Sequence, residues 1–215
     1  MLRSLRLRTA VPRLQELTLN SARSPTAMAT FLTIGHSNRS LDEFICMLMA
    51  ARARVLVDVR SFPRSRTNPV FNIDTLPGKL SEMQIAYRHC PRLGGRRPKQ
   101  KTVEESVNAL WRVQSFHNYA DYALSDDFGS ALSELIRLGS RSCVALMCSE
   151  AVWWRCHRRI IADYLLLNGH EVEHLMAPGH CTHATPTPGA ERTLNGKVVY
   201  PRGDAAAATS ATYLL

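Results

Sequence analysis

The segment 148–159 gathers side chains that can do chemistry. Its twelve residues include two cysteines, one glutamate, one histidine, two tryptophans and three arginines. Glu150 is the candidate general acid or base, because a carboxylate desolvated beside Trp153 and Trp154 would have a raised pKa. The alternative is that Glu150 forms an ion pair with Arg155 or Arg60 and only holds the loop.

Three interpretations of Cys148 and Cys156 stay open. Cys148 ends a strand before a helix N-terminus, a place where a thiol can be a nucleophile, similar in outline to rhodanese and cysteine-phosphatase loops. The loop departs from those because Arg155 lies seven residues after Cys148 and no glycine lines it. A zinc site of Cys148, Cys156 and His157 is the second interpretation, but paired C-x-x-C spacing is missing. The third is buried inert thiols, and we expect no metal and no cofactor.

Two other strand exits, 35–39 and 58–66, carry polar residues that suit an anion. The planar fork of arginine matches phosphate or carboxylate, and three arginines on one loop exceed what solubility requires. Together with the segment 148–159, these exits supply the candidate substrate ligands: His36, Ser37, Arg60, Ser61, Arg64, Arg66, Trp153, Trp154, Arg155 and Arg158.

Histidine and aspartate at these exits extend the candidate catalytic set to Glu150, His157, Asp58 and Cys148. His36 and His157 could carry protons near neutral pH, although a lone histidine is more often a hydrogen-bonded structural residue. Asp58 ends a buried strand two residues before Arg60. It could orient a histidine, or it could form a structural pair with Arg60.

The loop 88–101 is the most basic part of the domain. It contains six lysines and arginines and no acid, and Gly94-Gly95 predicts a close approach of the backbone to some group. Such a loop could follow a phosphate backbone, while Trp153 and Trp154 could stack on a base. The alternative is a solvated basic loop with one tryptophan in the core.

The elements that position these residues alternate between strand and helix. Apolar runs predict strands near 30–34, 54–59, 85–89, 143–148 and 171–175, with helices near 41–52, 74–84, 126–138 and after 157. Alternation of this kind predicts one α/β domain, a mostly parallel sheet of about five strands with helices on both faces. After Pro178 we expect loop and then a C-terminal β-hairpin, since Asn195-Gly196 suits a type I′ turn.

Composition sets the boundaries of the domain. Residues 1–28 are rich in arginine and resemble a transit peptide or follow an upstream start codon, so the α/β domain is expected at 29–203 with a frayed tail at 204–215. The net charge of +9 favours an anionic partner, such as nucleic acid or a phosphorylated small molecule. No apolar run is long enough to cross a membrane, and six irregularly spaced cysteines indicate reduced thiols. We expect a cytoplasmic protein, or an organellar one if the N-terminal segment is a transit peptide.

These motifs, in this order, resemble domain of unknown function family 488. The resemblance covers about residues 30–200 and implies an α/β domain with a polar site built from the motifs, without supplying a substrate. The matching pieces are Ile34-Gly35-His36-Ser37, Val57-Asp58-Val59-Arg60-Ser61 with Pro63 and Ser65, Leu93-Gly94-Gly95, Phe116 with Tyr119-Ala120, and Met147-Cys148-Ser149-Glu150 with Cys156-His157-Arg158.

Three functions compete. The first is an enzyme, a hydrolase or transferase, that acts on nucleic acid or a nucleotide with Glu150 as acid or base and arginines as anion ligands. The second is a non-catalytic nucleic-acid-binding module. The third is a thiol-dependent sulfur or phosphoryl transferase that uses Cys148. The oligomeric state does not follow from the sequence.

Overall fold

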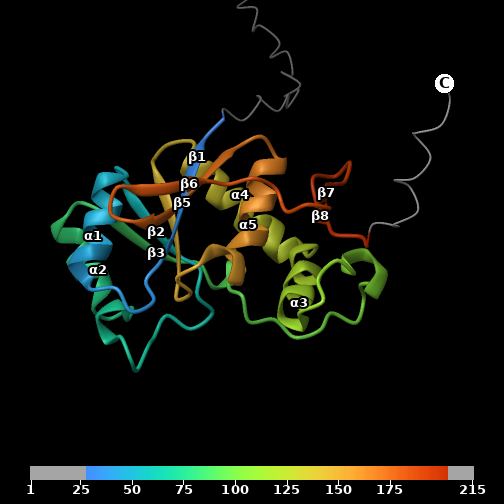
Figure 1. The fold of residues 1–215 in the computed structure, drawn as a ribbon, viewed down its shortest axis with the longest axis horizontal. Coiled ribbons are helices and arrows are strands. Elements are labelled where there is room, and N and C mark those ends of the chain that lie inside the picture. The colour runs from blue at the N-terminus through green and yellow to red at the C-terminus, as the bar shows by residue number, and fades with distance from the viewer. Residues whose placement is uncertain (1–27, 203–215) are drawn as a thin grey trace, which may run out of the picture.

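A computed structural model describes residues 28–202, and its centre is a six-stranded sheet (Figure 1). The strand order is β3-β2-β4-β1-β5-β6, and all pairs are parallel except β5 with β6. The strands are β1 (Thr30–Gly35), β2 (Val55–Asp58), β3 (Ala86–His89), β4 (Val144–Cys148), β5 (Glu171–Ala177) and β6 (His180–His183).

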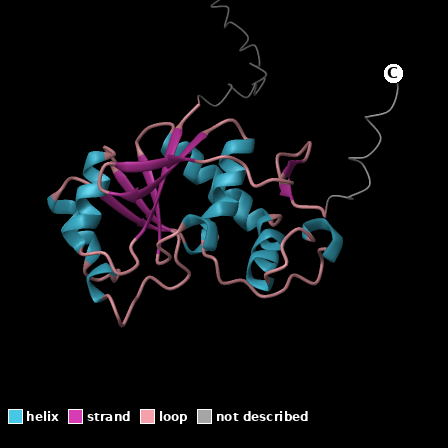
Figure 2. Cartoon of the chain, viewed as in Figure 1, coloured by secondary structure: helices cyan, strands magenta, loops and turns pink. Residues whose placement is uncertain are grey.

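Helices cover both faces of this sheet (Figure 2). The α-helices are α1 (Leu41–Ala50), α2 (Leu76–Glu82), α3 (Gln114–Ala123), α4 (Asp126–Gly139) and α5 (Arg158–Leu167). One apolar core lies under α1 and α2, and the other under α3, α4 and α5. Short 3-10 turns are η1 (Pro69–Phe71), η2 (Pro91–Leu93), η3 (Glu105–Asn108) and η4 (Trp153–Arg155), and a small hairpin pairs β7 (Glu191–Arg192) with β8 (Val198–Val199).

The central strands have side chains in both cores, which explains their unbroken apolar runs. In β4, Val144 and Leu146 pack into the α3–α5 core, whereas Ala145 and Met147 pack into the α1–α2 core. Successive side chains of a strand point to opposite faces, so a strand covered on both sides needs apolar residues at every position. Cys148 continues the alternation and points toward α5.

The carboxyl ends of β1, β2 and β4 meet at one edge of the sheet. Gly35 lies opposite Cys148, and Asp58 lies opposite Met147 in the neighbouring pair. Helix α1 connects β1 to β2 over one face, and α5 connects β4 to β5 over the other. The direction of winding therefore changes beside β4, and such a position favours a ligand crevice in α/β sheets.

The predicted α/β fold is confirmed, including the mostly parallel sheet and the C-terminal hairpin. Ser40 caps α1, since its Oγ accepts a hydrogen bond from the Glu43 backbone N–H. The prediction of a loop immediately after Pro178 is wrong for residues 180–183, where β6 pairs antiparallel with β5. A tight turn through Gly179, with φ of 72°, makes this possible although the strand is fully exposed and lacks an apolar pattern.

Two expectations about the chain ends concern residues outside 28–202. The N-terminal extension and the tail at 204–215 belong to segments that the structure does not describe, apart from Met28. Within 28–202, none of the helices has the length and apolar character that crossing a bilayer requires.

Candidate functional site

A cavity of about 850 Å³ lies at the edge where β1, β2 and β4 end. The exit loops of these strands, the Gly95 turn and the start of α3 enclose it. Its lining residues are His36, Arg60, Ser61, Phe62, Arg64, Ser65, Arg66, Gly95, Arg96, Ser115, Phe116, Cys148, Ser149, Glu150, Arg155, Cys156 and His157. The three strand exits that the sequence indicated therefore share one cavity.

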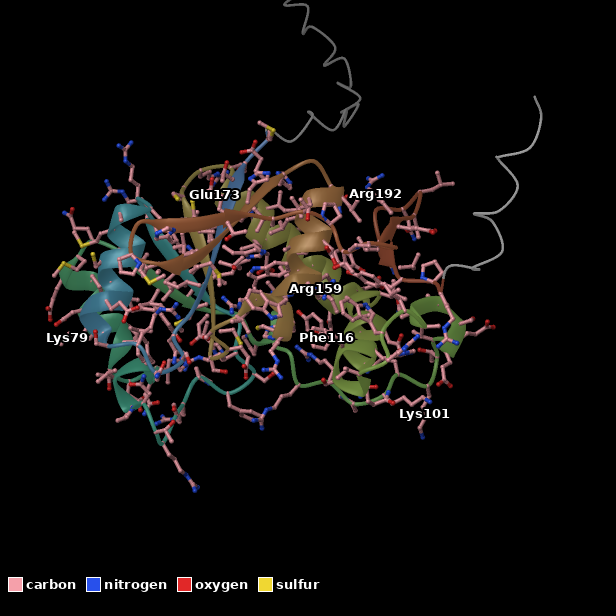
Figure 3. All side chains as sticks on the ribbon, in the orientation of Figure 1. Lys79, Lys101, Phe116, Arg159, Glu173 and Arg192 are labelled. Carbon is pink, nitrogen blue, oxygen red and sulfur yellow. The ribbon has the colours of Figure 1, made fainter. Side chains whose placement is uncertain are left out.

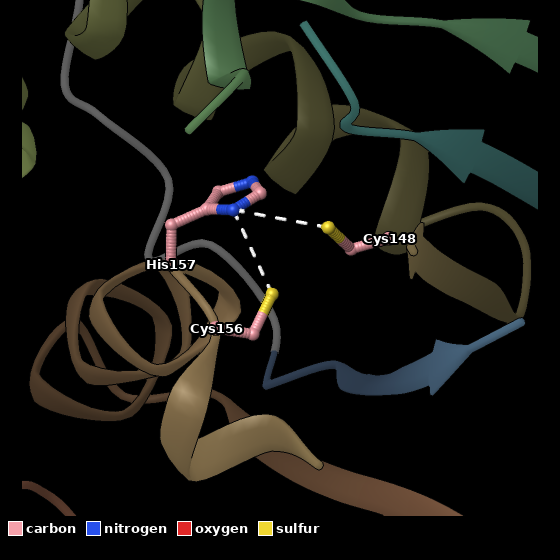
Figure 4. A group of neighbouring side chains, drawn as sticks. All are labelled: Cys148, Cys156 and His157. Atoms are coloured by element: carbon pink, nitrogen blue, oxygen red, sulfur yellow. Dashed lines mark hydrogen bonds between the residues drawn. The ribbon is translucent and has the colours of Figure 1, made fainter. Parts of the chain in front are cut away.

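Cys148, Cys156 and His157 form a compact cluster in the cavity wall (Figure 4). The Nδ1 atom of His157 lies 3.9 Å from the Cys148 sulfur and 3.6 Å from the Cys156 sulfur. The other ring nitrogen, Nε2, lies 3.1 Å from the Val59 carbonyl oxygen. Because a carbonyl only accepts, Nε2 carries the proton in the neutral ring and Nδ1 presents its lone pair to the sulfurs.

The two thiols differ in acidity, and Arg158 contacts only one of them. Arg158 donates from Nε to the Cys156 sulfur across 3.3 Å and from its terminal nitrogen to the Glu150 carbonyl oxygen. Burial alone would raise the pKa of Cys156, but the hydrogen bond from Cys148 and the Arg158 charge outweigh it and lower the pKa to about 6. The same hydrogen bond, together with burial, raises the pKa of Cys148 to about 12. Cys156 rather than Cys148, the predicted nucleophile, is thus the more acidic thiol of the pair.

Asp58 and Arg60 form a buried ion pair below the cavity. Arg60 donates from Nε to Asp58 at 2.9 Å and from its terminal nitrogen at 2.6 Å, and its backbone N–H also donates to this carboxylate. Tyr87 adds a hydroxyl donor at 2.7 Å. Both members of the pair are at most 5% exposed, so the carboxylate is fully engaged in holding Arg60. Arg60 consequently has little hydrogen-bonding capacity left for an anion.

His36 is a buried neutral residue of the same network. Its Nε2 lies 3.2 Å from the Arg60 guanidinium, and its ring stacks on Phe71 at 4.6 Å. Arginine only donates, so Nε2 accepts and Nδ1 carries the proton toward the Ser37 carbonyl oxygen. Burial and the Arg60 charge lower the pKa of His36 to about 4. This histidine supports the loop and stays uncharged near neutral pH.

Exposed charges surround the mouth of the cavity. Among the described residues, the exposed arginines without an acidic partner there are Arg66, Arg96 and Arg155, whereas the exposed Arg64 pairs with Asp74. Glu150 is the one carboxylate among the residues that line the cavity. Glu150 is itself exposed, and no ion pair of it occurs within the described part of the chain. The lining is therefore predominantly positive.

The tryptophans do not lie where the sequence suggested. The η4 turn directs Trp153 onto His174 of β5, with the rings stacked at 4.3 Å, and Trp154 is 47% exposed. Neither lines the cavity, so the expected desolvation of Glu150 by these rings is not found. The aromatic wall is instead formed by Phe62 and by Phe116.

A layered stack of side chains supports the wall at α3, and its two outer members, Arg159 and Phe116, are labelled in Figure 3. The Arg159 guanidinium lies 5.0 Å from the centre of the Trp111 ring, and Trp111 stacks on Phe116 at 5.0 Å. Arg159 also donates to the Thr187 hydroxyl. A cation placed on a ring and a second ring beneath it fix the orientation of Phe116 at the cavity.

Three glycines allow the loops of the site to come together. A Cβ atom on Gly35 would lie 1.9 Å from the Glu150 carbonyl oxygen, and one on Gly95 would lie 2.4 Å from Nδ1 of His157. A Cβ atom on Gly94 would meet the Ser61 side chain at 2.5 Å. The close approach predicted for Gly94-Gly95 is therefore made to the protein itself.

Most of the basic loop 88–101 is already engaged. Arg92 pairs with Glu134, Lys99 lies near Glu105, and Arg97 donates to the Gly94 and Pro91 carbonyls while lying over the Tyr122 ring. Arg96 is the one basic residue of this loop that lines the cavity. Its role could be foreseen only from its charge, whereas Tyr87 and Gly35 gave no chemical signal in the sequence.

Fold and site together define an α/β protein with a polar, positively charged cavity at the carboxyl edge of a mostly parallel sheet. The chain belongs to the family of domain of unknown function DUF488, whose model matches residues 40–165. The match runs from the cap of α1 into α5, a shorter span than the sequence motifs suggested, and leaves β1 and β5 outside. Searches of curated proteins and of solved structures gave no match.

Proposed function

We propose that this protein is an enzyme that binds and acts on a phosphate-bearing substrate, a nucleotide or nucleic acid, in the cavity. The observation that carries the proposal is the lining, in which Arg66, Arg96 and Arg155 are exposed around a single carboxylate. Such a mouth attracts anions and can hold phosphate oxygens through several donors. Phe62 and Phe116 supply an apolar wall that suits a base.

Glu150 is the proton carrier in this proposal. It lies in the lining next to Ser149 and shares the exit loop of β4 with the cysteine cluster. A positioned carboxylate contributes about 10²–10⁴-fold to rates of reactions that need proton transfer. Arg158, which was expected to hold phosphate, instead acts below the surface, since it is 1% exposed and holds the Glu150 carbonyl.

Binding can be tested by fluorescence titration of the full chain with nucleotides and oligonucleotides over a salt series. Arg66→Glu combined with Arg96→Glu should weaken binding at least about 10-fold and reduce the salt slope. The matched control, Arg54→Glu with Arg141→Glu, makes the same charge change on exposed residues at the opposite edge of the sheet. If both pairs weaken binding equally, the cavity is not the site.

Turnover separates the enzyme from a binding module. Glu150→Gln should leave binding near the wild-type value and lower turnover by about 100-fold or more. Retention of both binding and all detected turnover would remove Glu150 from the mechanism. Salt-sensitive binding at the cavity without any turnover by the wild-type protein would instead support the non-catalytic module.

A further inference from the structure

We propose that Cys148, Cys156 and His157 form a Zn²⁺ site whose fourth coordination position opens into the cavity. The three side chains come from the end of β4 and the start of α5, which the fold brings together (Figure 4). This inference does not depend on the proposed substrate, because metal binding can be measured without turnover.

The donor atoms have the spacing of a tetrahedral site. All three lie within 4.8 Å of one another, with the nitrogen 3.9 Å and 3.6 Å from the two sulfurs. Tetrahedral zinc with bonds of about 2.3 Å to sulfur and about 2.0 Å to nitrogen places its donors roughly 3.5–3.8 Å apart. The two nitrogen–sulfur distances therefore need shifts of a few tenths of an ångström, and the sulfur–sulfur distance, which is at most 4.8 Å, needs to shorten by at most about 1 Å.

The histidine is oriented as a ligand. Its Nε2–H is directed at the Val59 carbonyl oxygen, and this bond leaves Nδ1 unprotonated and facing both sulfurs. Metal-binding histidines commonly hold their second nitrogen in this way, because it fixes both the tautomer and the ring plane. The Tyr119 ring lies edge-on to the imidazole at 5.0 Å and restricts its rotation further.

The surroundings suit a metal thiolate. Arg158 donates to the Cys156 sulfur, and such a hydrogen bond balances negative charge on a metal-bound thiolate. Gly95 leaves space at the ring, since any side chain there would begin 2.4 Å from Nδ1. Both cysteines are buried, so the ligands are shielded from bulk water on the protein side.

The fourth position distinguishes a reactive site from a structural one. Structural zinc sites are closed by four protein ligands, whereas catalytic sites have three and keep a place for water or substrate. All three residues here line the cavity, so the open position faces the space that a substrate would occupy. Spacing alone did not favour this site because the ligands occur as a cysteine and, eight residues later, an adjacent Cys-His pair.

The test begins with the full chain purified without a metal-binding tag. Elemental analysis should find close to one zinc ion per chain, and removal of zinc followed by Co²⁺ should give the visible absorption of a tetrahedral thiolate site. Competition with a chromophoric chelator should give nanomolar or tighter affinity. The cobalt spectrum is read on wild-type protein, so it does not depend on whether any variant folds.

Variants assign the ligands. Cys148→Ser, Cys156→Ser and His157→Gln should each weaken zinc binding at least about 100-fold, with folding checked by circular dichroism. Cys46→Ser and Cys181→Ser are the controls, because both cysteines are exposed and lie outside the cluster, and they should bind zinc as the wild type does.

Three results would overturn the proposal. One is an absence of stoichiometric zinc or cobalt binding by the folded wild-type protein. Another is a Cys148→Ser variant that binds zinc as tightly as wild type. The third is rapid selective alkylation of Cys156 that added zinc does not slow, since this would identify a free thiolate and favour a thiol enzyme.

Discussion

Arg158 places its guanidinium Nε 3.3 Å from the sulfur of Cys156, two residues earlier, and both side chains are buried. No carboxylate pairs with Arg158 in the part of the chain that the structure describes. A buried cation needs a compensating negative charge, and the sulfur of Cys156 is the group placed to supply it. The contact therefore links the stability of the loop to the ionisation of one thiol.

Removing this cation should destabilise the protein. We expect Arg158→Met to lower the free energy of unfolding by about 3 kcal/mol, because the Glu150 carbonyl and the Cys156 sulfur lose their donor in a buried place. Urea denaturation measures the change. The control is Arg155→Met on the exposed neighbouring turn, which should have little effect. Equal effects of the two substitutions would show that Arg158 has no special role in stability.

Two glycine-to-alanine substitutions should change the free energy of unfolding in opposite directions. Gly95→Ala drives a methyl group into the His157 ring, which the Val59 carbonyl and Tyr119 hold in place, so a loss of about 1–3 kcal/mol is expected. Gly129→Ala, in α4, meets no atom within 4 Å and should gain about 0.5–1 kcal/mol. Thermal and urea unfolding compare the pair, and a destabilised Gly129→Ala would contradict the packing described for α4.

The buried pair of Asp58 and Arg60 should matter far more than an exposed one. Asp58→Asn leaves Arg60 uncompensated and is expected to cost about 3–5 kcal/mol. Disrupting the pair of Arg64 and Asp74, whose side chains are 65% and 61% exposed, should cost at most about 1 kcal/mol. Urea titrations of Asp58→Asn and Arg64→Gln test the contrast, which similar losses would refute.

Stability should fall in mild acid through His174. Burial, with the Arg158 charge, lowers its pKa to about 4 from an ordinary value of 6.5. Between these two pKa values His174 is protonated in the unfolded chain but neutral in the folded protein. Its contribution to the free energy of unfolding is therefore full above pH 6.5 and is lost as the pH falls toward 4. Between about pH 7.5 and about pH 5 the loss from this residue is about 2 kcal/mol.

A difference between variants isolates that contribution. His174→Asn should show a weaker pH dependence of the unfolding free energy than wild type, whereas His180→Asn on the exposed strand β6 should show an unchanged one. Identical pH profiles for all three proteins would mean that His174 is not buried in its neutral form.

The architecture could be predicted because its signals are local. Unbroken apolar runs such as 144–147 marked strands buried on both faces, and Asn195-Gly196 marked the position of the hairpin. The predicted type I′ turn is wrong, because it requires a positive φ at both residues and only Gly196, with φ of 80°, has one. Polar residues directly after three of these strands pointed to one edge, and the cavity lies there. The exposed strand β6 was missed because its pairing depends on a neighbour and not on its own pattern.

The partners within the site could not be predicted, because they depend on how loops turn. Trp153 follows Glu150 closely in the chain, yet the η4 turn directs it to His174. Cys148 and Cys156 hydrogen-bond to each other and Arg158 folds back onto Cys156, and these contacts separate the pKa values of two thiols that the sequence presents as alike. Such choices are settled by packing across elements, which residue order alone does not encode.

The position of β4 between β1 and β2 has a consequence for synthesis on the ribosome. Phe31 pairs with Val144, more than one hundred residues later, and Val55 pairs with the same residue from the other side. The nascent chain cannot bring β1 and β2 into one sheet until β4, which lies between them, has emerged from the ribosome. Until then, apolar side chains of β1 and β2 remain exposed to solvent. Long-range pairing of this kind folds slowly and exposes the chain to aggregation. Translation must therefore pass Cys148 before the sheet, and with it the cavity, can exist.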